Sequence, residues 1–294
     1  MVDVMSVIYK PASLRGRFQR EVALGFSLLL TSFVVSESVL AASASPPLFS
    51  SKKIELHGRS LELHLGMPQG DLCSNILVIY ASGDGGWFGT AVEMFKEIAQ
   101  LGFPVAGFSA RSYLKLLGYS TSPISAEELT LDYESLIQAA TQALALPSKT
   151  PAVLAGWSRG AAFAVLVGAE KKSDLNLAGV VAIGLPDKEE LNIRIHQKKI
   201  LIANFPNKRQ HMIFDTYEKI PDVAPLPLSL IQSTQDDYLP ASAARALFGV
   251  ESSCKKFFAV KAQNHRFSGG KTEFLHTLKE SLNWILRVDS HKGT

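Results

Sequence analysis

The sequence predicts an α/β fold with a mainly parallel central sheet, helices on both of its faces and a short cap-like insertion. After residue 75, short apolar runs typical of buried strands alternate with helical patterns, as they do in proteins with parallel sheets. Two short segments around Gly58-Arg59 have the pattern of a hairpin, which adds an antiparallel edge. The 294 residues are 47% hydrophobic and 19% charged, so a packed core is expected and a disordered chain is excluded.

The expected strands are short and mostly continuous in apolar residues, as in sheets that are covered on both faces. The hairpin consists of Ile54–Leu56 and Leu61–Leu65. The strands that follow it are Asn75–Ala81, Val105–Phe108, Ala152–Ala155, Leu177–Ile183, Leu228–Ile231 and Phe257–Val260.

The expected helices lie between these strands and carry apolar stripes at helical spacing. One begins at the capping box Ser125-Ala126-Glu127-Glu128 and ends before Pro147. The others are Ala91–Leu101, Gly160–Ala169, a helix that starts at Leu239-Pro240, and Thr272–Val288. The stretch from Asp187 to Pro227 has no regular pattern, and we expect it to be the short insertion.

The first 44 residues have the pattern of a secretory signal peptide. Basic residues precede an apolar run from Val22 to Val35, and the small residues Ala42-Ser43-Ala44 follow it. The apolar run is shorter than the ~20 residues that span a bilayer. We therefore expect export to the periplasm, with residues 45–294 as a single mature domain. An uncleaved membrane anchor is the alternative.

Charge and cysteine content argue against nucleic-acid binding, a disulfide and a metal site. The net charge of +3 is small and scattered, which argues against a nucleic-acid-binding protein. Cys73 and Cys254 precede strands that we expect to be four apart, about 19 Å at ~4.8 Å per strand, so a disulfide is not expected. Neither cysteine has a CxxC partner or a histidine at ligand spacing, and no metal site is expected.

The pentapeptide Gly156-Trp157-Ser158-Arg159-Gly160 is a G-x-S-x-G motif. It stands between an expected strand and an expected helix, which is the context that a nucleophile elbow requires. The tight turn places the serine hydroxyl above the sheet, at the positive end of the following helix. Ser158 is therefore the candidate nucleophile.

A serine nucleophile needs a histidine base and an acid, which in this arrangement follow it along the chain. Among the seven histidines, His265 follows an expected strand and precedes the final helix, so it is the candidate base. Asp236 lies just after the strand Leu228–Ile231 and is the favoured acid. Asp237 is its rival, and Asp187 is a more distant third.

The oxyanion hole requires two backbone N–H groups, one of them from the residue after the nucleophile. That residue is Arg159. The second donor is expected from the glycine-rich segment Ser82–Trp87, with Asp84 as the favoured residue. This segment is not a dinucleotide-binding turn, because Phe88 stands where the third glycine would be needed. Trp87 is a candidate substrate contact, although packing in the core is at least as well supported.

Four segments together resemble the bacterial virulence protein family VirJ/AcvB. They are Ser82–Trp87 as S-G-D-G-G-W, the elbow, Ser233–Pro240 and Asn264–Phe267, and the resemblance covers about residues 75–288. The family's members are exported α/β-hydrolase-fold proteins; some are linked to type IV secretion, and some hydrolyse the aminoacyl ester of lysyl-phosphatidylglycerol. The resemblance implies an α/β-hydrolase fold, a triad of Ser158, Asp236 and His265, and oxyanion donors at Asp84 and Arg159.

The leading functional hypothesis is a periplasmic serine hydrolase that cleaves a carboxylic ester and needs no cofactor. The resemblance alone points to aminoacylated phosphatidylglycerol at the membrane surface as the substrate, with Asp237 and Trp87 as candidate partners of its ammonium groups. The alternatives are a general carboxylesterase and a non-catalytic adaptor for secretion-system proteins. The insertion carries four basic residues that would contact anionic headgroups or form a solvated loop face, and the absence of an amphipathic helix favours the loop face. They are Lys198, Lys199, Lys208 and Arg209.

Overall fold

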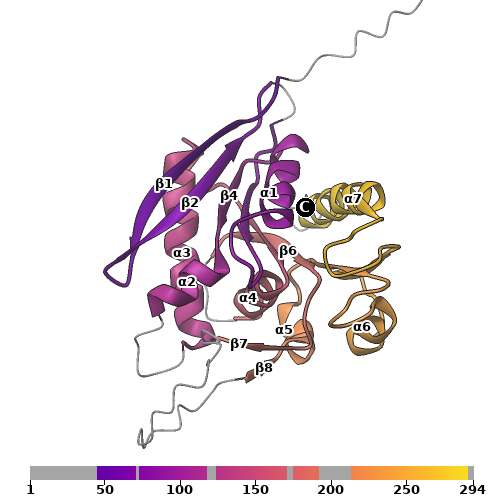
Figure 1. The fold of residues 1–294 in the computed structure, drawn as a ribbon. Helices are drawn as coiled ribbons and strands as arrows, with labels where there is room; N and C mark the ends of the chain where they lie inside the picture. The colour runs from indigo at the N-terminus through magenta and orange to yellow at the C-terminus, as the bar shows by residue number, and fades with distance from the viewer. Residues whose placement is uncertain (1–44, 71–72, 118–123, 171–174, 192–212, 291–294) are drawn as a thin grey trace, which may run out of the picture. The chain divides into compact units, whose positions relative to one another are not determined.

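The computed structural model describes residues 45–70, 73–117, 124–170, 175–191 and 213–290. These residues build a sheet in the order β1-β2-β4-β3-β5-β6-β9-β10. Figure 1 shows the β1–β2 hairpin beside β4. The expected signal peptide and the four basic residues of the insertion lie outside the described residues. The strands are β1 (Leu48–Leu56), β2 (Arg59–Met67), β3 (Leu77–Ala81), β4 (Val105–Phe108), β5 (Ala152–Trp157), β6 (Leu177–Ile183), β9 (Leu228–Ser233) and β10 (Lys255–Val260).

The sheet is mainly parallel, as predicted. From β4 through β3, β5, β6 and β9 to β10, every neighbouring pair runs parallel. The hairpin of β1 and β2 joins this sheet through an antiparallel pairing of β2 with β4. All five residues of β3 are buried, which explains why this strand is a continuous apolar run rather than an alternating one.

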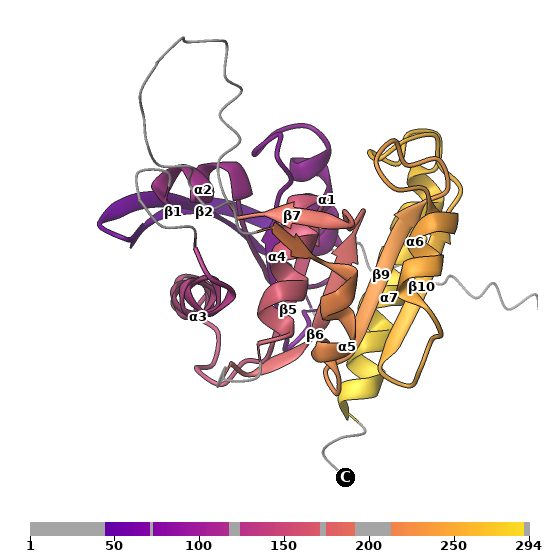
Figure 2. The ribbon, with the colours of Figure 1, turned by 90° about the horizontal axis from the view of Figure 1, so that it is seen from below.

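Helices cover both faces of the sheet, and each face has its own core. Apolar side chains of α1 (Thr90–Gln100) and α7 (Lys271–Ser290) pack on one face. The other face carries α2 (Ala110–Leu117), α3 (Ala126–Ala143), α4 (Arg159–Gly168), α5 (Ile220–Val223) and α6 (Ala241–Phe248). Figure 2 shows α3 and α4 beside the strands, with α6 and α7 near β10. Within the described ranges, none of the helices is long and apolar enough to span a bilayer.

The capping box predicted at the start of α3 is present. The Ser125 hydroxyl accepts a hydrogen bond from the Glu128 N–H at 3.1 Å, and the Glu128 carboxylate accepts one from the Ser125 N–H at 2.8 Å. These bonds satisfy two N–H groups that the first helical turn would otherwise leave unpaired.

Helix α2 was not expected from the sequence. It is short, and its buried residues are Ala110, Tyr113 and Leu114, which is too brief a stripe to stand out as a helical pattern. The Ser109 hydroxyl accepts a hydrogen bond from the Ser112 N–H at 3.1 Å and thereby supports the first turn.

The segment expected to be an insertion contains regular structure in its described part. β7 (Lys188–Glu190) pairs antiparallel with β8 (Ile213–Asp215). The short helix η1 (Tyr217–Lys219) and α5 then lead into β9. The Thr216 N–H donates to the Asp187 carbonyl at 2.9 Å, so the chain just before β7 contacts the chain just after β8.

The two cysteines are free. Cys73 precedes β3 and Cys254 precedes β10, and these strands lie four positions apart in the sheet order. This agrees with the expectation that no disulfide joins them.

Candidate active site

Ser158 occupies a strained turn between β5 and α4. Its backbone angles are φ 58° and ψ −121°, a region that costs free energy for a residue with a side chain. Steric contacts explain why glycines flank Ser158 on both sides. A Cβ on Gly156 would lie 2.0 Å from the Gly160 carbonyl oxygen, and a Cβ on Gly160 would lie 2.1 Å from the Ala81 carbonyl oxygen. The local geometry is therefore that of a nucleophile elbow.

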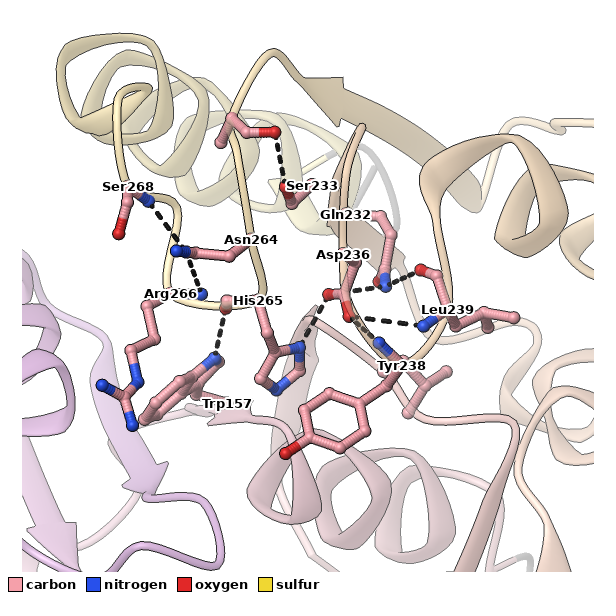
Figure 3. Close-up of polar contacts among 12 residues, drawn as sticks. Trp157, Gln232, Ser233, Asp236, Tyr238, Leu239, Asn264, His265, Arg266 and Ser268 are labelled. Carbon is pink, nitrogen blue, oxygen red and sulfur yellow. Dashed lines mark hydrogen bonds and ion pairs between the residues drawn. The ribbon is translucent and has the colours of Figure 1, made fainter.

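The structure brings Asp236 and His265 into direct contact. The His265 Nδ1 lies 2.6 Å from the Asp236 Oδ2, and the two residues are only 7% and 2% exposed (Figure 3). Asp236 follows β9 and His265 follows β10, so the parallel pairing of these strands sets both loops at the same edge. Such a contact holds the imidazole in one tautomer and orientation.

Backbone and amide groups fix the Asp236 carboxylate. Its Oδ1 accepts hydrogen bonds from the N–H groups of Tyr238 at 2.9 Å and Leu239 at 3.3 Å. Its Oδ2 accepts a further bond from the Gln232 side-chain amide at 3.1 Å. Asp237 is exposed, and Asp236 is the acid that contacts His265.

The imidazole of His265 lies between two aromatic rings. The Trp157 indole N–H donates to the His265 carbonyl at 3.2 Å, and the Trp157 and His265 rings stack with centroids 5.5 Å apart. The Tyr238 ring approaches edge-on at 4.9 Å. The His265 Nε2 is buried and makes no hydrogen bond within the described residues.

His265 and Ser158 line the same cavity, which has a volume of about 430 Å³. Arg111 and Lys115 of α2, Lys188 of β7 and Tyr238 also line it, together with the carboxylates of Asp84 and Glu189. A histidine that has one nitrogen on a carboxylate and lines the same cavity as a serine has the arrangement of a general base.

The two expected oxyanion donors lie beside the nucleophile. A Cβ on Gly83 would lie 3.1 Å from the Ser158 Cβ, so the loop that carries Asp84 passes next to Ser158. The Arg159 N–H stands at the first position of α4, where a helix offers no acceptor of its own. The N–H groups of Asp84 and Arg159 are therefore the candidate oxyanion donors.

The Arg159 side chain is buried and paired with two carboxylates. Its Nη1 lies 2.6 Å from the Asp84 Oδ1, and its Nε lies 2.8 Å from the Glu189 Oε1. Burial raises the pKa of the Glu189 carboxyl; Arg159 lowers it in part, and Asp84 adds to the rise.

Two residues expected to contact substrate lie elsewhere. Trp87 stacks on His64 with ring centroids 4.2 Å apart and packs against Tyr80 and Phe95. The interpretation of Trp87 as a residue that packs in the core therefore fits the structure, since its ring lies against Gly107 of β4. Neither Trp87 nor Asp237 is among the described residues that line the cavity.

Sequence reasoning missed several residues of the site. Gln232 is a buried amide that contacts Asp236, and Glu189 is a buried carboxylate that contacts Arg159. Tyr238 packs on the His265 ring. A glutamine within the apolar strand β9 was a usable signal, because a buried amide needs hydrogen-bond partners. Glu189 gave no comparable signal, because it lies in a segment without a regular pattern. Within the described ranges, no cluster of three or more histidine, cysteine or acidic residues is suited to hold a metal ion.

Comparison with known proteins identifies the family. The family model described as bacterial virulence protein (VirJ) matches residues 75–226, just over half of the chain. The chain belongs to the VirJ family. The match includes Asp84, Ser158 and Arg159 and ends before Asp236 and His265. A search among curated proteins found no match.

Solved structures similar to this VirJ-family chain share its fold at low sequence identity. Est1E from Butyrivibrio proteoclasticus is 12% identical, with a TM-score of 0.55 over 81% of this chain and 99% of that one. An α/β serine hydrolase homologue from Coxiella burnetii is 17% identical, with a TM-score of 0.55 over 79% and 97%. The Pyrococcus furiosus esterase Pf2001 is 15% identical, with a TM-score of 0.55 over 81% and 93%. These likenesses establish the α/β-hydrolase fold.

Proposed function

We propose that this VirJ-family protein is an exported serine hydrolase that cleaves a carboxylic ester. One observation carries the proposal: the buried His265 has its Nδ1 on Asp236, has no partner for its Nε2 among the described residues, and lines the same cavity as Ser158. The similar structures named as esterases support it at the level of fold.

In the proposed reaction, the Ser158 hydroxyl attacks the ester carbonyl while the His265 Nε2 takes its proton. Asp236 stabilises the resulting imidazolium. The N–H groups of Asp84 and Arg159 bind the oxyanion of the tetrahedral intermediate. Collapse of the intermediate breaks the bond to the alcohol, which leaves with the proton from His265. Water, deprotonated by His265, then attacks the acyl-enzyme and releases the acid.

We further propose that the substrate is lysyl-phosphatidylglycerol, so that the products are lysine and phosphatidylglycerol. Membership of the VirJ family supports this choice, because the family resemblance implies it. Arg111, Lys115 and Lys188 line the cavity and suit the anionic phosphodiester of the lipid. The Asp84 carboxylate lines the same cavity and suits an ammonium group of the lysyl moiety.

The test compares the wild-type protein with Ser158→Ala on vesicles that contain lysyl-phosphatidylglycerol, with free lysine as the readout. We expect the wild type to release lysine and Ser158→Ala to be slower by about 10⁶-fold, the scale seen when a triad loses its nucleophile. Ser135→Ala is the matched control, because this hydroxyl lies exposed on α3.

Two other outcomes would replace the proposal. Cleavage of short-chain esters without lysine release would indicate a general carboxylesterase. Failure to cleave either substrate, with no labelling by a fluorophosphonate probe, would indicate a non-catalytic adaptor that binds secretion-system proteins.

A further inference from the structure

The Arg159 side chain is an unusual feature beside the candidate nucleophile. It is only 4% exposed, yet it carries a full charge. Burying a charge is costly unless it is paired with good geometry, and here two carboxylates from distant parts of the chain provide the pairing. Asp84 comes from the loop after β3, and Glu189 comes from β7.

The loop that carries Asp84 is anchored at its start. The Ser82 N–H donates to the Phe108 carbonyl at 3.0 Å, and the Ser82 hydroxyl accepts a bond from the Ala110 N–H at 3.3 Å. The Gly86 N–H closes a turn onto the Gly83 carbonyl at 3.1 Å. Asp84 lies at the outer part of this turn and its side chain is 54% exposed. Its ion pair with Arg159 is the contact that connects it to the elbow.

The opposite side of the guanidinium is braced. The Glu189 carboxylate holds the Arg159 Nε and also accepts a bond from the Glu190 N–H at 2.9 Å. The planar fork of arginine presents donors in fixed directions to both acids at once, which the single ammonium of lysine does not do. Glu189 is only 4% exposed, so the brace is shielded from solvent.

We propose that Arg159 is a positioning residue for the oxyanion hole. Its guanidinium, braced by Glu189, holds Asp84 so that the Asp84 N–H faces the oxygen of the carbonyl group attacked by Ser158. Arg159 thus supplies one donor through its backbone and aligns the other through its side chain. This inference rests on the proposed serine hydrolase function and adds to it the means by which the second donor is held in place.

Two substitutions separate this role from the backbone donors, because Asp84→Asn and Arg159→Lys both keep the N–H groups. Losing one oxyanion donor costs about 10²–10³ in kcat. Misalignment should cost less, about 10- to 100-fold in kcat, with KM for a short-chain ester little changed. The double variant should lose hardly more than Arg159→Lys alone, because Arg159→Lys already breaks the contact that Asp84→Asn removes. Glu280→Gln, which removes an ion pair with Lys256 at 2.9 Å elsewhere on the surface, is the matched control.

Binding of a trifluoromethyl ketone reports directly on the oxyanion hole, since the serine adduct of this inhibitor mimics the tetrahedral intermediate. We expect its inhibition constant to rise in proportion to the fall in kcat/KM for Asp84→Asn and Arg159→Lys. If Asp84 and Arg159 had a purely structural role, the inhibition constant would not change in proportion to kcat/KM. Unchanged kcat and unchanged inhibition in the exposed-site variant Asp84→Asn would overturn the inference, because that substitution does not threaten folding.

Hydrogen exchange of the amides in residues 82–87 tests the anchor without relying on turnover. Both variants should exchange faster in this loop than the wild type, while exchange in the core strands stays the same. Equal exchange rates of this loop in the variants and the wild type would contradict the proposal that Arg159 anchors it. If the wild type cleaves no ester at all, the proposed function fails, and the exchange result still decides whether Arg159 holds the loop.

Discussion

Gln232 illustrates how a single residue holds the candidate acid in place. Its side-chain N–H groups donate to the Asp236 carboxylate at 3.1 Å and to the Leu239 carbonyl at 2.7 Å. Both partners are acceptors, so the amide orientation is determined. Gln232 is 1% exposed, and replacing it removes a charge-assisted hydrogen bond from a site that water reaches poorly.

Gln232→Leu should therefore lower kcat by about tenfold, since a hydrogen bond to a charged group contributes ~1.5–3 kcal/mol and Asp236 keeps its other donors. Gln232→Glu should lower kcat further, because it sets a second carboxylate against Asp236. Steady-state kinetics on a short-chain ester measures both variants. The exposed Gln138→Leu on α3 is the control, and equal kcat in Gln232→Leu and Gln138→Leu would contradict this role.

At the scale of elements, aromatic packing adds to the β2–β4 pairing that attaches the β1–β2 hairpin to the sheet. His64 of β2 stacks on Trp87, with an interplanar angle of 5°, and Trp87 meets Phe95 of α1 edge-on at 5.2 Å. Trp87 belongs to the loop that follows β3, so this contact also ties the far end of the candidate oxyanion loop to the hairpin. Burial lowers the pKa of His64 below its ordinary 6.5, and Glu62 opposes the shift in part.

This lowered pKa predicts how stability depends on pH. Above pH 6.5, His64 is neutral in both the folded and the unfolded chain; as the pH falls, the unfolded chain takes up the proton first. The free energy of unfolding should therefore fall as the pH drops from about 7 through the lowered pKa of His64. His64→Phe keeps an aromatic ring on Trp87 and cannot ionise, so its stability should depend less on pH in this window.

Urea unfolding at a series of pH values between about 7 and 5 measures this dependence. His276→Gln, an exposed position on α7, serves as the control and should retain the wild-type slope. An identical slope in His64→Phe and wild type would show that His64 does not contribute.

At the scale of the whole molecule, the sheet topology assembles the candidate site. Loops that follow β3, β5, β9 and β10 carry Asp84, Ser158, Asp236 and His265. These strands run parallel, so their carboxyl ends lie at one edge of the sheet, where ligands bind in open α/β sheets. Residues separated by up to 181 positions along the chain (265 − 84) thereby meet at one cavity.

Export of the whole protein is a separate prediction, made from the first 44 residues. The mature protein should begin near Ser45 and be recovered from the periplasm, because small residues at Ala42 and Ala44 suit signal-peptide cleavage. N-terminal sequencing of the periplasmic fraction tests the start. Ala44→Phe should block cleavage and leave the longer chain. Recovery of wild-type protein in the cytoplasm with residues 1–44 intact would contradict the prediction.

Local sequence patterns were sufficient to predict most of the fold and all three residues of the candidate triad. Continuous apolar runs such as that of β3 predicted buried parallel strands, and G-x-S-x-G between a strand and a helix predicted the elbow at Ser158. Asp236 and His265 followed from their positions after β9 and β10, because the order of loops along a parallel sheet is fixed by the chain. Helix α2 was missed because three buried residues make too short a stripe.

Sequence by itself thus determined the fold class, the elbow and the loops that bear the candidate acid and base, since these depend on local patterns and strand order. Tertiary structure decided which side chains meet. It placed Asp236 on His265 and left Asp237 exposed, put Trp87 on His64 and outside the cavity, and joined Arg159 to Asp84 and Glu189. The physical reason is that ion pairs and ring contacts depend on the directions of side chains from segments far apart in the chain, and those directions are set only when the sheet and its helices pack.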